Sequence, residues 1–148
     1  MPRKIGILIM ALTAIIAFLY VPSGHTEEKD WEKTVTLPNG QVVLDMNGEW
    51  DAIYDNKDFG TNKDVVNITQ EGNKFVGIKL IGNEFLPKGV ATIRGELEEN
   101  GFKSLYGYNI AHGWTLSKGQ ISNDGNTIVI ETPIEAYGYT AVLTLTRK

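Results

Sequence analysis

Two segments of the chain share the outline of a β-hairpin, and this repeat constrains the fold more than any other feature. Residues 68–76 are Ile-Thr-Gln-Glu-Gly-Asn-Lys-Phe-Val, and residues 121–129 are Ile-Ser-Asn-Asp-Gly-Asn-Thr-Ile-Val. In both segments a glycine lies between two β-rich arms, where it can supply the positive φ that a tight hairpin turn requires. The sequence therefore predicts a fold made of consecutive hairpins.

The same alternation of strand and turn continues through the last hundred residues. Short turns separate eight predicted strands at residues 48–54, 63–70, 73–81, 89–98, 102–111, 114–122, 126–132 and 139–147. Strands joined by short turns pair as antiparallel neighbours, and closure of the sheet removes its exposed edges. Gly77, Gly95 and Gly107 lie inside predicted strands and favour strong curvature. We therefore expect an all-β fold, an eight-stranded antiparallel up-and-down β-barrel, over residues 47–148.

The first 23 residues have the composition of a signal peptide or an N-terminal membrane anchor. Arg3 and Lys4 precede an uncharged, mostly apolar run from Ile5 to Val21. The run is longer than a typical signal-peptide core and just reaches the length of a membrane span, so cleavage and retention both stay open. Arg3 and Lys4 tend to stay in the cytoplasm, so the chain that follows the apolar run is expected to cross the membrane. In either case we therefore expect an extracytoplasmic domain, periplasmic or secreted.

Residues 24–46 connect this segment to the predicted barrel. Residues 24–33 are rich in charge and predict a tether. Residues 34–44 place Pro38-Asn39-Gly40 between two β-rich arms, which predicts an accessory hairpin. Because proline cannot donate a hydrogen bond to a sheet, we expect this hairpin to lie at an edge or outside the main sheet.

Charge and composition narrow the classes of partner and chemistry. After residue 23 the chain has 18 acidic residues against 12 Lys and Arg, a formal charge of −6, which disfavours nucleic acid. We expect membrane contact only through the N-terminal segment, if it is uncleaved. There is no cysteine, and His112 is the only histidine of the predicted barrel, so we expect no metal, no cofactor and no enzymatic activity. Five acidic residues gather around the first strand without the spacing of a calcium loop or a catalytic pair, namely Glu49, Asp51, Asp55, Asp58 and Asp64.

Residues at the two ends of the predicted barrel resemble a pattern of the calycins, which include the lipocalins and the avidin-like proteins. Gly48-Glu49-Trp50 is similar to the G-x-W motif that opens the first strand of such barrels, and Arg147 lies near the end of the last strand. The resemblance covers about residues 48–148 and implies that Arg147 packs across Trp50 and closes one end of the barrel. It also implies a small bacterial lipocalin-like barrel that binds ligands. The chain lacks the Thr-Asp-Tyr signature of lipocalins and the helix before their last strand.

Strand alternation suggests where a ligand would bind. Phe102, Tyr106, Tyr108 and Trp114 share one parity, and tyrosines that line a cavity offer flat apolar surface with a hydroxyl group. We therefore predict a site for a small, partly apolar ligand whose contacts are Tyr54, Tyr106, Tyr108 and Trp114. The alternative, that these rings fill the interior and leave no cavity, is not decided by the sequence. The alternative function is a protein-binding module that uses loops 55–64, 82–88 and 132–138, with Phe85 and Tyr137 as anchors.

Overall fold

The computed structural model describes residues 29–148, so the predictions for a signal peptide or anchor and for the start of the tether lie outside the described residues. The described chain consists of β-strands and one short 3-10 helix. These elements are β1 (Thr34–Thr36), β2 (Val42–Leu44), β3 (Gly48–Asn56), β4 (Gly60–Glu71), β5 (Lys74–Lys79), β6 (Ala91–Glu98), β7 (Gly101–Asn109), β8 (Gly113–Leu116), β9 (Lys118–Ile121), β10 (Thr127–Ile134), η1 (Glu135–Tyr137) and β11 (Tyr139–Arg147).

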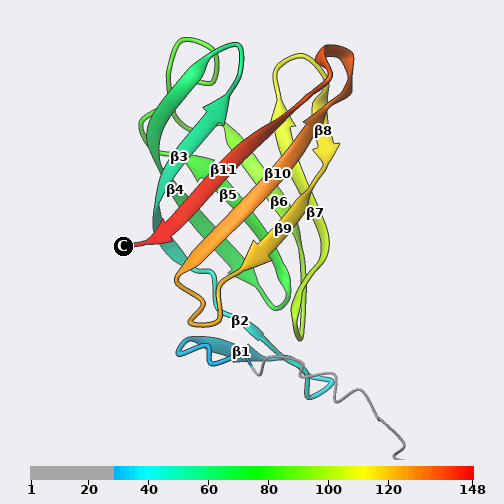
Figure 1. Cartoon of the computed structure of the whole chain (residues 1–148). Coiled ribbons are helices and arrows are strands. Elements are labelled where there is room, and N and C mark those ends of the chain that lie inside the picture. Colours follow the sequence, from blue (N-terminus) through cyan, green and yellow to red (C-terminus); the bar gives the residue numbers. More distant parts are fainter. Residues whose placement is uncertain (1–28) are drawn as a thin grey trace, which may run out of the picture.

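Nine of the strands form one antiparallel sheet that curls into a nearly closed barrel (Figure 1). Their order is β8-β7-β6-β5-β4-β3-β11-β10-β9. This confirms the prediction of an all-β, antiparallel barrel, but the sheet has nine strands where we expected eight. The predicted strand 114–122 is divided at Ser117, because β8 pairs with β7 whereas β9 pairs with β10. One stretch of chain therefore brings the two edges of the sheet together.

Both repeated segments are hairpins, as predicted. The first joins β4 to β5 through a two-residue turn, with Gly72 at φ 61°, and the second joins β9 to β10 through a longer loop, with Gly125 at φ 75°. Every described residue with a positive φ is a glycine. We call the end of the barrel that holds these two turns the lower end, and the opposite end the upper end (Figure 1).

A β-bulge at the start of β7 changes which side chains face inward. The register between β6 and β7 shifts there, which leaves Lys103 as an extra residue. Phe102 packs against the core before the bulge, and Leu105 and Gly107 are buried after it. An extra residue reverses the alternation of a strand, so the single inward parity that we predicted for β7 and β8 is wrong. The residues that this correction concerns are Tyr106, Tyr108 and Trp114.

Glycines inside strands allow the close approach that the curvature requires. A Cβ atom at Gly77 would come within 2.7 Å of Ile93 Cγ1, and one at Gly107 would collide with Thr132 Oγ1. Both glycines face the interior, where any larger residue would displace a neighbour. This agrees with the curvature expected from their positions.

Gly119 on β9 lies where the two edges of the sheet meet, and a Cβ atom there would come within 2.6 Å of Leu105 Cδ2 and Phe102 Cε2. We predict that Gly119→Ala lowers the free energy of unfolding by about 1–3 kcal/mol, the usual cost of overpacking. Urea denaturation measures this loss. The control is the exposed neighbour, for which Gln120→Ala should change stability by no more than about 0.5 kcal/mol. An unchanged midpoint for Gly119→Ala would contradict the close approach.

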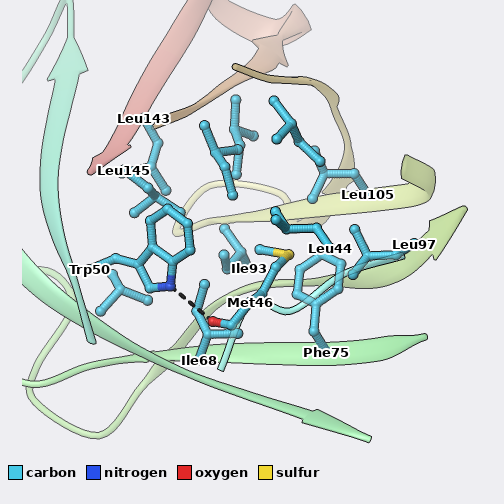
Figure 2. Packing of buried hydrophobic residues seen from close by; sticks show 14 of the residues in the cluster. Leu44, Met46, Trp50, Ile68, Phe75, Ile93, Leu97, Leu105, Leu143 and Leu145 are labelled. Atoms are coloured by element: carbon cyan, nitrogen blue, oxygen red, sulfur yellow. Dashed lines mark hydrogen bonds between the residues drawn. The ribbon is translucent and has the colours of Figure 1, made fainter. Parts of the chain in front are cut away.

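The lower half of the barrel is packed and is covered by the β1–β2 hairpin (Figure 1). The hairpin forms a sheet of its own, as predicted from its proline. Val43, Leu44 and Met46 are fully buried and belong to the core cluster. Figure 2 shows Leu44 and Met46 among the residues of the barrel core. Gln70 ties this segment to β4, because its side-chain amide donates to the Leu44 carbonyl at 3.0 Å and its amide oxygen accepts from the Met46 N–H at 2.7 Å.

The end of the segment that we expected to be a tether also contacts the lower end. The Trp31 indole N–H donates to the Ser122 carbonyl at 3.2 Å, and the Lys29 ammonium donates to the Ile121 carbonyl at 3.1 Å. Gly125 lies directly against Trp31, since a Cβ atom there would come within 3.0 Å of the indole. From residue 29 onward the chain is therefore part of the packed structure.

Candidate functional site

The upper half of the barrel contains a cavity of about 110 Å³. It exists because the inward side chains near this end are small, among them Thr92, Gly107, Thr132 and Ala141, whereas leucine, isoleucine and phenylalanine fill the lower half. The upper loops contribute apolar residues that are partly exposed, so the cavity reaches the surface. These residues are Phe59, Phe85 and Ile110, with exposed fractions of 42%, 47% and 45%.

Two of these residues form one wall of the opening. The rings of Phe59 and Phe85 lie 4.6 Å apart between centroids and are tilted by 50°, although they come from the β3–β4 and β5–β6 loops. Asn83 holds the second loop in shape, because its side-chain oxygen accepts hydrogen bonds from the backbone N–H groups of Phe85 and Leu86. One wall of the opening is therefore apolar, and hydrogen bonds hold one of its two loops in shape.

A buried polar cluster lies beside the cavity. The Lys79 ammonium is 3.4 Å from the Asp64 carboxylate, and it lies 4.4 Å from the centre of the Tyr54 ring. The Tyr54 hydroxyl donates to Thr92 Oγ1 at 3.0 Å. Lys79 and Thr92 are each only 2% exposed, and Tyr54, Lys79 and Thr92 all line the cavity.

Strand geometry explains how these four residues meet. Asp64 shares the inward parity of Val66 on β4, and Lys79 shares that of Phe75 on β5, so both charges face the interior. Thr92 is the extra residue of a second bulge, between β5 and β6, which turns its side chain inward beside Ile93. Our reading of the sequence did not find Lys79 or Thr92, and it grouped Asp64 with exposed acids. The sequence did contain a signal for the ion pair, because β4 and β5 each have one charged residue, Asp64 and Lys79, at a position that faces inward.

Asp64 is a fixed anion at this site. Its carboxylate accepts hydrogen bonds from the backbone N–H groups of Val65, Ile81 and Gly82, at 2.7, 3.1 and 2.9 Å. Burial tends to raise the pKa of Asp64, but these hydrogen bonds and the charge of Lys79 outweigh it and hold the pKa below its ordinary value. The carboxylate thus stays ionised and keeps its position.

Tyr54 is a neutral phenol at this site, because burial raises its pKa above the ordinary value. Above about pH 10 the unfolded chain releases the Tyr54 proton while the folded protein retains it. Stability should therefore fall as pH rises through this range, and the fall should be smaller for Tyr54→Phe. Urea midpoints at pH 9, 10 and 11 measure both slopes. Parallel slopes for the two proteins would contradict the burial of the phenol.

The structure separates the four predicted ligand contacts into two groups. Tyr54 and Tyr108 line the cavity. Tyr106 and Trp114 do not line it and lie instead around Arg94 on the outer face of the barrel, with the Arg94 guanidinium 5.8 Å from the Tyr106 ring centre and 4.3 Å from that of Trp114. The bulge at the start of β7 turns Tyr106 outward. Tyr108 has the same parity and packs against Trp114 with 5.4 Å between ring centres, but it also borders the cavity beside Asn109 and Ile110.

Trp50 and Arg147, the predicted closing pair, lie at the lower end. The Arg147 guanidinium is 4.3 Å from the centre of the Trp50 ring, and the two residues are register partners on β11 and β3. Trp50 is fully buried and its indole N–H donates to the Met46 carbonyl at 2.9 Å (Figure 2). Arg147 donates to the Asp45 carbonyl at 2.8 Å. This pair joins the two barrel strands to the chain that leads from the hairpin.

The remaining titratable residues do not converge on a second site. Residues 29–148 contain no group of three His, Asp or Glu side chains that could hold a metal ion. The acidic residues that the sequence grouped with Asp64 are exposed, namely Glu49, Asp51, Asp55 and Asp58. His112 is also exposed and lies beside Tyr137, with 6.3 Å between ring centres. Within the same range, no helix has the length and hydropathy of a membrane span.

Fold and site together define a small antiparallel β-barrel with one packed end and one end that opens into a cavity. Comparison of the chain with protein-family models, with curated proteins and with solved structures found no match. The function must therefore be inferred from the cavity itself.

Proposed function

We propose that the protein is an exported, lipocalin-like barrel that binds a small, partly apolar ligand in the cavity at its upper end. The observation that carries this proposal is the contrast between the two halves of the barrel. The lower half is packed and covered, whereas the upper half keeps a cavity with an apolar wall at its opening and a polar cluster beside it. An apolar cavity with a few oriented polar groups is the usual form of a small-molecule site.

The proposed kinship with calycins has separate support. Trp50 and Arg147 make the contact that the resemblance implies, and they do so at the end opposite the cavity. The proposed export rests on the composition of the first 23 residues. The proposal of ligand binding does not depend on either point, because it is supported by the shape of the barrel interior.

The size of the cavity limits the ligand. Drug-sized molecules occupy pockets of roughly 300–1,000 Å³, whereas an engineered apolar cavity of about 150 Å³ in another protein accepts benzene. At about 110 Å³, the cavity described here fits one small ring or the end of a longer chain whose remainder lies in the opening. Phe59 and Phe85 would then contact the outer part of such a ligand.

Binding can be tested with small aromatic and short aliphatic probes in nuclear magnetic resonance titrations of the ¹⁵N-labelled protein. We expect concentration-dependent shifts at residues that line the cavity, such as Thr92 and Thr132. Ala141→Leu should abolish them, because a larger side chain on the inward face of β11 fills the cavity. The matched control is Thr146→Leu, an exposed position on the same strand. If no probe shifts these resonances, the proposal is wrong.

A second candidate function is protein binding through the upper loops. It is favoured by the exposed aromatic residues Phe59, Phe85 and Tyr137, of which Tyr137 is 59% exposed. Exposed aromatic residues on loops are typical anchors in interfaces. Phe59 and Phe85 also border the cavity, so the two functions share part of one surface. A partner that still binds the Ala141→Leu variant but not a Phe85→Ser, Tyr137→Ser variant would favour this alternative.

A further inference from the structure

The charges around the cavity restrict the kind of ligand that it can accept. Among the described residues that line it, only Asp55 and Lys79 are charged. Asp55 is exposed at the end of β3, so solvent screens it. Lys79 is 2% exposed and is the one buried charged residue of the cavity wall.

This ammonium already has its counterion. Asp64 lies 3.4 Å away, and three backbone N–H groups hold its carboxylate in place, so a ligand cannot displace it without leaving those donors unsatisfied. Tyr54 adds no charge, since burial keeps its phenol protonated. The polar cluster is therefore neutral as a whole.

A polar cluster that is neutral as a whole disfavours the binding of charged ligands. A ligand carboxylate would be a second anion for a single buried cation, and its desolvation would not be compensated. A ligand ammonium would lie next to Lys79 and be repelled by it. Each charged ligand loses a large free energy of hydration when it enters the cavity, whereas an uncharged ligand of the same size loses much less hydration free energy.

An uncharged ligand can still make a directed hydrogen bond. An ammonium group has three N–H donors, and Asp64 is the only carboxylate within ion-pair distance of Lys79 among the described residues. A carbonyl, hydroxyl or ether oxygen of a ligand can accept one of the remaining donors. Such a bond has an ionised donor and is stronger than one between neutral groups.

We propose that the cavity selects uncharged ligands that combine a ring-sized apolar body with an acceptor oxygen directed at Lys79, in preference to carboxylates and amines. This inference rests on the proposed ligand-binding function and specifies its chemistry. Alcohols, ketones, esters and amides of small ring compounds meet the requirement.

The test compares four probes that share one ring: benzyl alcohol, toluene, benzoate and benzylamine. Dissociation constants are measured at pH 7 from the nuclear magnetic resonance titrations described above. We expect benzyl alcohol to bind about tenfold or more tightly than benzoate and benzylamine, and more tightly than toluene. If benzoate or benzylamine binds as tightly as benzyl alcohol, the inference is wrong while ligand binding stands. If none of the four binds, both proposals fail.

Two variants locate the origin of the selectivity. Lys79→Met removes the donor, so the preference for benzyl alcohol over toluene should disappear. Asp64→Asn removes the counterion but keeps one amide oxygen, which can accept from the backbone N–H groups of Val65 and Ile81 that now share one carboxylate oxygen, so the preference should move toward benzoate. Lys103→Met is the matched control, because this lysine is exposed and pairs with Glu96 on the outer surface. If Asp64→Asn does not fold, the Lys79→Met ratio alone decides, and an unchanged ratio overturns the inference.

Discussion

Asp64→Ala is expected to lower the free energy of unfolding by about 3–5 kcal/mol, because it leaves a buried charge without its partner. The Lys79 ammonium is 2% exposed and loses its counterion. The same substitution removes the acceptor of the backbone N–H groups of Val65, Ile81 and Gly82. Two of these groups begin the β5–β6 loop, so this loop should also lose order. Urea denaturation measures the stability, and amide hydrogen exchange measures the loop.

Lys79→Met should lower the free energy of unfolding less than Asp64→Ala does, because the residue that remains after each substitution keeps different contacts. After Lys79→Met the carboxylate still accepts three backbone hydrogen bonds, and methionine fills most of the lysine volume. The control pair is Glu96 and Lys103, at 3.7 Å on the surface, where removal of either charge should change stability by no more than about 1 kcal/mol. If Lys79→Met destabilised the protein more than Asp64→Ala, the backbone hydrogen bonds to Asp64 would not have the inferred stabilising role.

The barrel itself could be predicted because its signals are local. Each turn glycine marks a reversal, and consecutive hairpins leave few other ways to arrange a sheet. The division of the predicted strand 114–122 could not be predicted in this way. It depends on Ser117, whose backbone N–H donates to the Leu105 carbonyl at the point where the chain changes partners. The Ser117 hydroxyl also lies 2.8 Å from Thr132 Oγ1 on β10, a strand that does not follow β8 directly in the sequence, so no local pattern records the change of partners.

The candidate site was predicted only in part, and bulges are the main reason. Tyr54 lines the cavity because β3 keeps its alternation without interruption from Trp50 to Tyr54. Alternation did not place Tyr106, because the extra residue Lys103 reverses the two faces of β7. It missed Thr92 for the same reason on β6. A bulge changes one pairing by one residue, and nothing in the composition of either strand indicates where it occurs.

Lys79 and Asp64 could have been found from the sequence by a different argument. Charged residues rarely take inward positions unless they are paired. The inward parity of β4 includes Asp64 and that of β5 includes Lys79, and the two strands are joined by a two-residue turn. An ion pair inside the barrel was therefore implied by two strand patterns taken together. Each pattern alone suggests only a strand that ends at the surface.

Trp50→Ala is expected to lower the free energy of unfolding by about 3–5 kcal/mol, the usual cost of removing a fully buried aromatic side chain. The loss should be large because Trp50 connects β3, β11 and the segment that leads from the hairpin, through Arg147 and the Met46 carbonyl. Urea denaturation followed by circular dichroism measures it.

Two further substitutions at tryptophan–arginine contacts show whether the stability lost in Trp50→Ala comes from the buried indole or from its contact with the cation. Trp114→Ala removes the ring that packs on Arg94 at the outer face, and should cost about 1 kcal/mol. Arg147→Met removes the cation from Trp50 but also removes a buried Nε atom that has no hydrogen-bond partner among the described residues, so its cost should stay below about 2 kcal/mol. If Arg147→Met destabilised the protein as much as Trp50→Ala, the cation rather than the buried indole would hold the lower end together.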